Sequence, residues 1–85
     1  MFYTYVLLSL KDNSFYTGYC SDLVKRYKQH QSGKVISTKD RRPLKLIYYE
    51  ACINKEDAIA REKYLKSGMG KRYIRNRIKR FLKDL

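Results

Sequence analysis

FYTYVLLSLKDNSFYTGYC, residues 2–20, has the pattern of a β-hairpin. Residues 2–9 are aromatic and aliphatic with β-branched members, which favours a strand, and residues 15–20 favour a second one. Residues 11–14 between them have turn chemistry, since Asp and Asn tolerate the backbone angles of tight turns. We therefore expect the chain to begin with two paired strands.

The rest of the chain predicts one further strand and three helices. Ser21 or Asp22 can cap a helix that runs to about Ser32, and Gly33 can end it. A loop is expected over 34–43 and a strand over 44–52. The next helix begins at an Asn54 cap, with Asp57 three places on, and ends near Gly68. Gly68-Met69-Gly70 then separates it from a final helix over 71–84. The order ββαβαα predicts an α+β fold, a three-stranded antiparallel sheet packed by helices.

Length and charge bound the function. The 85 residues suit one domain over 1–85, which buries roughly 60 % of its unfolded surface and leaves little room for a large cofactor. Lys and Arg number 20 against 8 acidic residues, a formal net charge of +12. So positive a surface favours a polyanionic partner such as nucleic acid. A merely solubilising charge is the alternative, and no apolar run or amphipathic lipid anchor indicates a membrane.

The two cysteines do not indicate a metal site. Cys20 and Cys52 lie in expected strands, without the CxxC spacing of zinc ligands. The chain begins with Phe2 and Tyr3 rather than a basic segment followed by an apolar signal core. We expect a cytoplasmic monomer with reduced thiols and no structural metal.

Glu62 departs from its local pattern. On a helical wheel of residues 54–67 it lies between Ala58 and Leu65, within the face that should pack inward. A carboxylate there is costly unless it is paired or bound to a cation. One interpretation is an i,i+4 ion pair with Lys66. The other is a carboxylate that holds a Mg²⁺-like ion, which keeps several waters and binds substrate phosphate.

Arg26 and His30 are one helical turn apart in the first expected helix. An arginine can make two hydrogen bonds to a phosphate, and a nearby imidazole can donate or accept a proton. The alternative interpretation is a pair of ordinary surface residues.

The tyrosines of the hairpin form a third unusual group. Alternation places Tyr3 and Tyr5 on one face of the first strand, and Tyr16 and Gly18 on one face of the second. If the register aligns these faces, Tyr5 and Tyr16 converge above a glycine whose missing Cβ leaves room for a ligand. The alternative is that tyrosines simply pack well in strands. A phenol is a poor base near its ordinary pKa of about 10, and nearby positive charge would lower that value.

The final expected helix is amphipathic. Ile74, Ile78, Phe81 and Leu85 share one stripe. The other faces are mostly basic, which predicts a solvated surface or one that follows phosphates.

Several short motifs together resemble the GIY-YIG nucleases over Phe2 to about Phe81. This family includes phage homing endonucleases and the amino-terminal incision domain of the bacterial nucleotide-excision-repair nuclease, and the resemblance is closest to short stand-alone bacterial proteins. The motifs are Tyr3-Thr4-Tyr5, Tyr16-Thr17-Gly18, Arg26 and His30 in DLVKRYKQH, Glu62 in AIAREKYLKSG, and Asn76 in GKRYIRNRI. The first triplet matches the family only at Tyr5, and Asn76 rests on the resemblance alone.

The resemblance implies a metal-dependent DNA endonuclease that serves DNA repair or recombination, with a partner protein that supplies specificity. Glu62 would hold Mg²⁺ or Mn²⁺, and Arg26 would neutralise charge on the phosphate. Tyr5 or Tyr16 would deprotonate or orient the attacking water with help from His30. Substrate-binding roles fall to Gly18, Lys66 and Asn76. The alternative is a non-catalytic module that binds DNA or RNA and uses its tyrosines as stacking platforms.

Overall fold

The computed structural model describes all residues, Met1–Leu85, and confirms an α+β fold. Its three strands form one antiparallel sheet in the order β2-β1-β3. None of its helices is long and apolar enough to cross a lipid bilayer. The elements are β1 (Phe2–Ser9), β2 (Phe15–Cys20), α1 (Leu23–Gln31), a 3₁₀ turn (Lys39–Arg41), β3 (Leu44–Cys52), α2 (Lys55–Lys66), α3 (Gly68–Arg77) and α4 (Lys79–Lys83).

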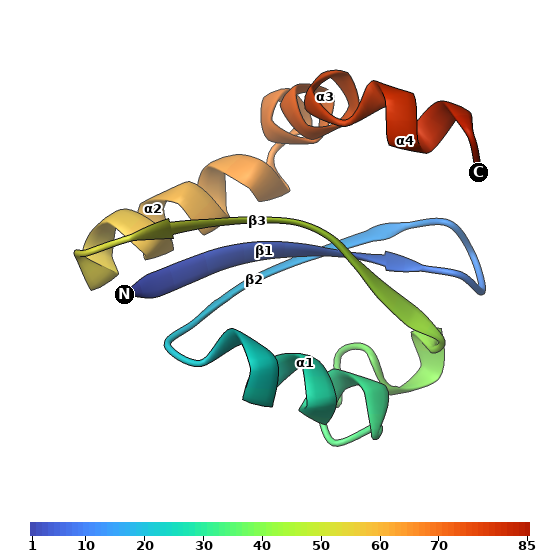
Figure 1. Cartoon of the computed structure of the whole chain (residues 1–85), viewed down its shortest axis with the longest axis horizontal. Coiled ribbons are helices and arrows are strands. Elements are labelled where there is room, and N and C mark those ends of the chain that lie inside the picture. Colours follow the sequence, from blue (N-terminus) through green and yellow to red (C-terminus); the bar gives the residue numbers. More distant parts are fainter.

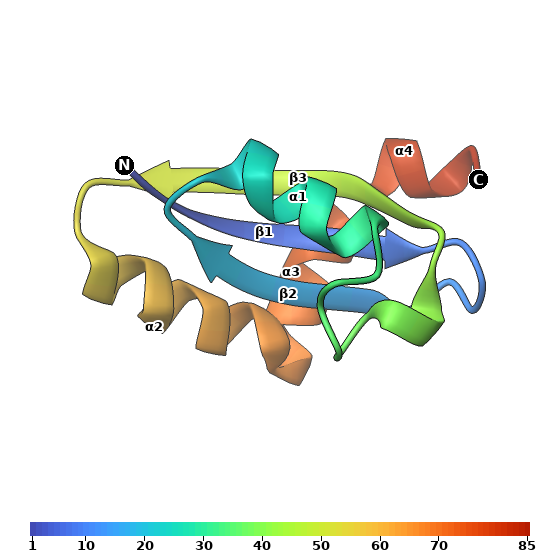
Figure 2. The ribbon, with the colours of Figure 1, turned by 90° about the horizontal axis from the view of Figure 1, so that it is seen from below.

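The sheet lies between two helical layers. Helix α1 covers one side, and α2, α3 and α4 lie on the other (Figure 1). Seen from the α1 side, α2 runs beside the edge strand β2 (Figure 2). The central strand β1 serves both layers because successive side chains point to opposite faces. Tyr5 and Leu7 pack on the α1 side, whereas Val6 packs with Leu65 of α2 and Ile74 of α3.

The hairpin has the register that brings the tyrosine faces together. Tyr5 pairs with Gly18, and Leu7 pairs with Tyr16. In the turn, Asn13 has a φ of +59°, a conformation that asparagine adopts more readily than most residues. Its amide donates to the Ser9 carbonyl at 2.7 Å. The local chemistry of residues 11–14 therefore sets the register on which the site depends.

The predicted ends of α1 and the start of α2 are confirmed. The Asp22 side chain accepts a hydrogen bond from the Lys25 amide at 3.1 Å, and Gly33 adopts a φ of +79° after the helix. The Asn54 side chain accepts from the amide of Glu56 at 2.8 Å. These caps depend on neighbouring residues alone, which is why the sequence predicts them.

The C-terminal helices differ from the prediction. Gly68 and Gly70 do not interrupt the helices but lie within α3, because α2 already ends at Lys66. Ser67 is both the C-cap of α2 and the N-cap of α3, where its hydroxyl accepts a hydrogen bond from the Gly70 amide at 3.1 Å. A Cβ at Gly70 would lie 2.0 Å from the Tyr64 carbonyl oxygen, so the close packing of α3 on the end of α2 requires glycine there. The expected single helix over 71–84 is also wrong, because the helix is interrupted at Ile78.

The apolar stripe of this region is only partly used. Ile74 is buried and Ile78 and Phe81 are half-buried, but Leu85 is 63 % exposed. The stripe therefore holds α3 against the sheet and weakens towards the end of the chain.

The loop over 34–43 contains the 3₁₀ turn, which the sequence did not indicate. The Ser9 hydroxyl, at the end of β1, donates to the Arg41 carbonyl at 2.6 Å. Thr38, just before the turn, is fully buried. The loop over 34–43, whose sequence is polar, is thus held against the sheet by a hydrogen bond.

Candidate active site

His30 is at the centre of the polar groups buried under α1. It lies in the last turns of that helix and is fully buried, so the interpretation as a surface residue is wrong. Its Nε2 is 2.8 Å from the Tyr5 hydroxyl, and its Nδ1 is 2.7 Å from the Thr38 hydroxyl. The Tyr5 and Tyr16 rings lie edge-on to the imidazole, with centroids at 5.6 and 5.3 Å. Both predicted tyrosines therefore meet at one histidine.

The neighbouring groups assign the histidine tautomer. The Thr38 hydroxyl also faces the Val35 carbonyl at 3.5 Å, which can only accept a hydrogen bond. If Thr38 donates to Val35, it accepts from His30 Nδ1–H, and Nε2 then accepts from the Tyr5 hydroxyl. The reverse order would leave the buried Tyr5 proton without an acceptor. We therefore assign a one-directional chain, Tyr5 to His30 to Thr38.

Burial keeps His30 neutral. Desolvation, with a smaller effect of the Arg26 positive charge, lowers the pKa of His30 to about 4. At neutral pH the imidazole is uncharged and its Nε2 can take up a proton.

Tyr5 holds its proton more tightly than a free phenol does. Burial, followed by electrostatic repulsion between the Tyr5 and Tyr16 phenol groups, raises the pKa of Tyr5 well above its ordinary value. The nearby Arg26 lowers that pKa only in part, and the Glu62 carboxylate raises it. The expectation that positive charge would lower the pKa of this phenol is therefore wrong for Tyr5. Tyr16, Arg26 and Glu62 therefore all influence the Tyr5 hydroxyl electrostatically, and Glu62 does so least.

Gly18 has a different role from the predicted one. A Cβ built on Gly18 would lie 2.6 Å from the Tyr5 hydroxyl oxygen, so the space above this glycine is filled by the phenol of its cross-strand partner. No ligand can approach the backbone there. The prediction that the missing Cβ admits a ligand is corrected: Gly18 lets the Tyr5 ring reach His30.

Tyr16 is the more accessible of the two phenols. Its hydroxyl accepts a hydrogen bond from the Ser37 hydroxyl at 3.3 Å, and the Arg41 guanidinium lies 5.9 Å from its ring centroid. Both partners come from the loop over 34–43. This loop thus contacts both tyrosines, directly at Tyr16 and through Thr38 and His30 at Tyr5.

Arg26 lies one turn before His30 on α1 and is half-buried. It helps to line a polar hollow of about 370 Å³. The lining residues are Cys20, Ser21, Asp22, Lys25, Arg26 and Gln29. A guanidinium and an ammonium in one hollow make a suitable place for a phosphate.

Glu62 lies on α2, the helix that runs beside β2 (Figure 2). Its side chain is 16 % exposed, and its Oε2 is 3.6 Å from Lys66 Nζ, so the predicted i,i+4 ion pair is present. No group of three or more His, Cys, Asp or Glu side chains gathers to hold a metal ion. A divalent cation at Glu62 would therefore have one protein carboxylate, and Mg²⁺ commonly binds with one or two carboxylates, waters and phosphate. The residues fit an ion of that kind.

Two predicted substrate-binding residues lie apart from the histidine centre. Asn76 is exposed on α3, across the sheet from α1 (Figure 1), and no hydrogen bond involves its side chain. Lys66 is 53 % exposed, and its ammonium pairs with the Glu62 carboxylate. Thr38, which holds His30, was missed by the sequence reasoning. No periodic pattern marks it, and only its place in a loop between two predicted elements could have drawn attention to it.

These features define a small α+β domain with paired tyrosines around a buried histidine. The chain belongs to the GIY-YIG family, since the family model described as the GIY-YIG catalytic domain matches residues 1–79. The predicted family is confirmed.

The relatives are small bacterial proteins. The chain is 44 % identical over 63 residues to the UPF0213 protein YazA of Bacillus subtilis, which covers 73 % of this chain and 64 % of that protein. It is 45 % identical over 67 residues to the UPF0213 protein CPE1444 of Clostridium perfringens, covering 78 % and 71 % of the two chains. Its fold is similar to the solution NMR structure of the UPF0213 protein BH0048 from Bacillus halodurans, with a TM-score of 0.56, 36 % identity, and coverage of 92 % and 86 %.

Proposed function

We propose that this protein is a divalent-metal-dependent endonuclease that hydrolyses phosphodiester bonds in DNA. The observation that carries the proposal is the hydrogen-bonded chain from Tyr5 through His30 to Thr38; the charges of Arg26 and, more weakly, Glu62 also influence the same phenol. The net charge of +12 supports a nucleic-acid substrate. Membership of the GIY-YIG family supports the reaction class.

The two buried groups can pass a proton in one direction. Because its pKa is raised, Tyr5 is a phenol at neutral pH and cannot act as a preformed phenolate. Its oxygen can accept a proton from the attacking water while its own proton moves to Nε2 of His30, which is neutral and already oriented to accept it. The water O–H bond breaks as its oxygen attacks phosphorus, and the P–O bond to the leaving oxygen then breaks. Tyr16 would orient the water from the more accessible side.

Arg26 and Glu62 supply the charges that this reaction needs. The Arg26 guanidinium would bind the phosphate and neutralise the negative charge that develops on its oxygens. Glu62 would hold the divalent ion, and Lys66 would turn from the carboxylate towards the DNA backbone. A bound Mg²⁺ or Mn²⁺ supplies positive charge that stabilises the leaving oxygen.

Thr38 acts as a positioning residue. By accepting the Nδ1 proton, it keeps the lone pair of His30 directed at Tyr5. We place Gly18 in the same supporting role, and we extend the proposal to a function in DNA repair or recombination with a partner that presents the substrate.

The test compares wild type with Glu62→Gln on supercoiled, branched and single-stranded DNA, in Mg²⁺, Mn²⁺ or EDTA. We expect nicking that needs the metal and is abolished by Glu62→Gln while DNA binding is retained. Glu56→Gln is a matched control, since it removes an exposed carboxylate from the same helix and should leave nicking intact. Equal turnover by wild type and Glu62→Gln would contradict the metal role.

A second candidate is a non-catalytic nucleic-acid-binding module. The observation that favours it is the ion pair of Glu62 with Lys66, which satisfies the carboxylate without a metal. Salt-sensitive DNA or RNA binding, with no cleavage under any metal condition, would select this candidate over the endonuclease.

A further inference from the structure

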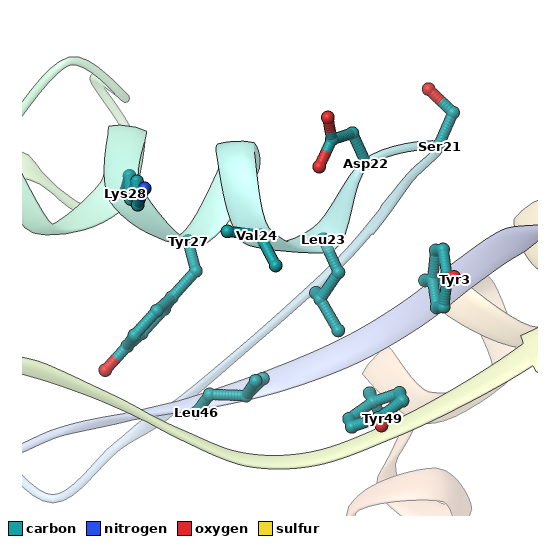
Figure 3. Close-up of a pocket in the computed structure, with 9 residues that line it drawn as sticks. All are labelled: Tyr3, Ser21, Asp22, Leu23, Val24, Tyr27, Lys28, Leu46 and Tyr49. Atoms are coloured by element: carbon teal, nitrogen blue, oxygen red, sulfur yellow. The ribbon is translucent and has the colours of Figure 1, made fainter.

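A second hollow, largely apolar, lies on the α1 side of the sheet (Figure 3). It is about 540 Å³ in volume, within the range of small-molecule sites. Leu23 extends from the helix towards Tyr3 and Tyr49, which lie on the strands (Figure 3). The residues around it are Tyr3 from β1, Leu46 and Tyr49 from β3, Ser21 and Asp22, and Leu23, Val24, Tyr27 and Lys28 from α1.

The hollow is closed near the end of α1, and its lining is partly exposed. Near the end of α1, Tyr27 and Gln31 both donate to the Leu44 carbonyl, at 3.2 and 2.8 Å, and tie the helix to β3. Elsewhere in the lining Val24 is 67 % exposed and Tyr49 is 54 % exposed. Large apolar side chains that gather in an open hollow indicate a binding surface.

The hollow is lined by one lysine and one aspartate, and further lysines lie beside it. Lys28 lines it, and Lys25 and Lys28 together line an adjoining polar hollow that also contains Val24. The one acidic residue at the rim is Asp22, whose carboxylate is already engaged by the Lys25 amide. An aromatic and aliphatic floor with an adjoining surface of lysines fits a flat apolar group attached to an anion, which is the chemistry of a nucleotide.

The apolar hollow also adjoins the candidate active site. It shares Ser21 and Asp22 with the polar hollow that contains Arg26. A strand whose phosphate binds at Arg26 can therefore place a neighbouring base against Tyr49. A base that enters a hollow between a helix and a sheet must first leave its stack and its pair.

We propose that this hollow binds an unpaired base of the DNA substrate, and that the protein therefore selects DNA with an unpaired nucleotide next to the cleaved bond over fully paired duplex. This inference rests on the proposed function, and it names the substrate class. The base stacks on Tyr49, and the adjacent backbone follows Lys25 and Lys28.

The test is a binding measurement that does not require cleavage. Fluorescence anisotropy in EDTA at fixed salt compares a labelled duplex with a short single-stranded flap and a fully paired duplex of the same length. We expect tighter binding of the flap, and an approximately 10-fold loss of that preference in Tyr49→Ala because a stacked base loses its platform. Tyr49→Phe keeps the ring and should keep the preference. Ile53→Ala, at an 85 % exposed residue that does not line the hollow, is the matched control.

Val24→Asp is a second test variant, in which the substituted residue lies on α1 and not in a strand of the sheet. The side chain is mostly exposed, so the fold is retained, and a carboxylate at the mouth of the hollow should reduce flap preference as well. Equal wild-type binding of both DNAs, or an unchanged preference in Tyr49→Ala and Val24→Asp, would overturn the proposal. A wild-type dimer that Val24→Asp dissociates in sedimentation would also overturn it, because the hollow would then join two copies. Metal- and Glu62-dependent nicking is scored separately, so the endonuclease proposal can stand or fall without this one.

Discussion

The two sides of the sheet use similar residues for different purposes. On the α2 and α3 side, Arg61 pairs with Glu50, and its guanidinium lies 5.1 and 4.8 Å from the ring centroids of Tyr64 and Tyr73. On the α1 side, Arg26 forms no ion pair with any carboxylate. One arginine is neutralised within the fold, and the other keeps its charge for a ligand.

The tyrosines show the same contrast. Tyr48, which packs against the cluster of Val6, Leu65 and Ile74, donates its hydroxyl proton to Glu50 at 2.9 Å. Tyr5 donates instead to a neutral imidazole that can take up a proton. A phenol held by a carboxylate is a structural group, whereas a phenol held by His30 can exchange its proton. Experiments can test this difference between groups that are paired within the fold, Arg61 and Tyr48, and groups that are left for chemistry, Arg26 and Tyr5.

The largest expected effect is on Tyr5. Tyr5→Phe keeps the ring over Gly18 but removes the hydroxyl, and we expect cleavage to fall by about 10²–10⁴-fold, the usual contribution of general acid–base catalysis. Single-turnover cleavage rates measure this loss, and thermal unfolding checks the fold. A loss confined to Tyr16→Phe, with Tyr5→Phe fully active, would move the base to the other phenol.

Substitution of Arg26 should affect activity, whereas substitution of Arg61 should affect stability. Arg26→Ala should reduce cleavage by on the order of 10²-fold with little change in stability, because it removes a charge that acts on the phosphate. Arg61→Ala should keep most activity but lower the free energy of unfolding by about 1–3 kcal/mol, since it removes the ion pair with Glu50 and leaves that carboxylate only its hydrogen bond from Tyr48. Denaturant titration and cleavage assays on both variants make the comparison. Similar losses of activity in the two variants would contradict the assignment of different roles to Arg26 and Arg61.

The third effect is a pH dependence of stability. The pKa of His30 is about 4 in the folded protein and ordinarily 6.5, so the unfolded chain binds a proton more readily than the folded one between these values. The free energy of unfolding should therefore be highest above pH 6.5 and fall, on the order of 3 kcal/mol, as the pH drops to about 4. Denaturant titrations of wild type and His30→Gln over this range isolate the effect, because both contain the same carboxylates. Parallel curves would contradict the buried, neutral state of His30.

The smallest effect is expected at Thr38. Thr38→Val keeps the shape but removes the acceptor for Nδ1–H, and we expect about a 10-fold loss of cleavage through misorientation of His30. Thr38→Ser restores the hydroxyl and should recover the rate. The pH–rate profile is the decisive measurement, since a purely structural defect would lower the rate equally at every pH.

Local signals explain what could be predicted from the sequence. The hairpin, the Asp22 and Asn54 caps and the Gly33 stop each depend on a few adjacent residues, and all are present. The joint at Ser67 and the interruption at Ile78 depend on how α3 packs, which no window of sequence contains. For this reason the C-terminal helices were predicted with the wrong boundaries.

The candidate site divides in the same way. Tyr5, Tyr16, Arg26, His30 and Glu62 could be singled out because each departs from a local pattern or matches a motif. The burial of His30 could not, because the loop over 34–43 that covers it has no periodicity to indicate that it packs. The role of Gly18 was misread for a related reason: alternation shows which face a residue shares, but not which neighbour fills the space above it.

The contact between position 18 and the phenol opposite it has a consequence for natural variation. Because a Cβ at position 18 would lie only 2.6 Å from the Tyr5 hydroxyl oxygen, positions 18 and 5 cannot be substituted independently. Homologues that carry alanine or a larger residue at the first site should have a shorter side chain at the second and so lack its proton donor. The residues at positions 5 and 18 of each homologue would then distinguish family members that keep the phenol from those that have lost it.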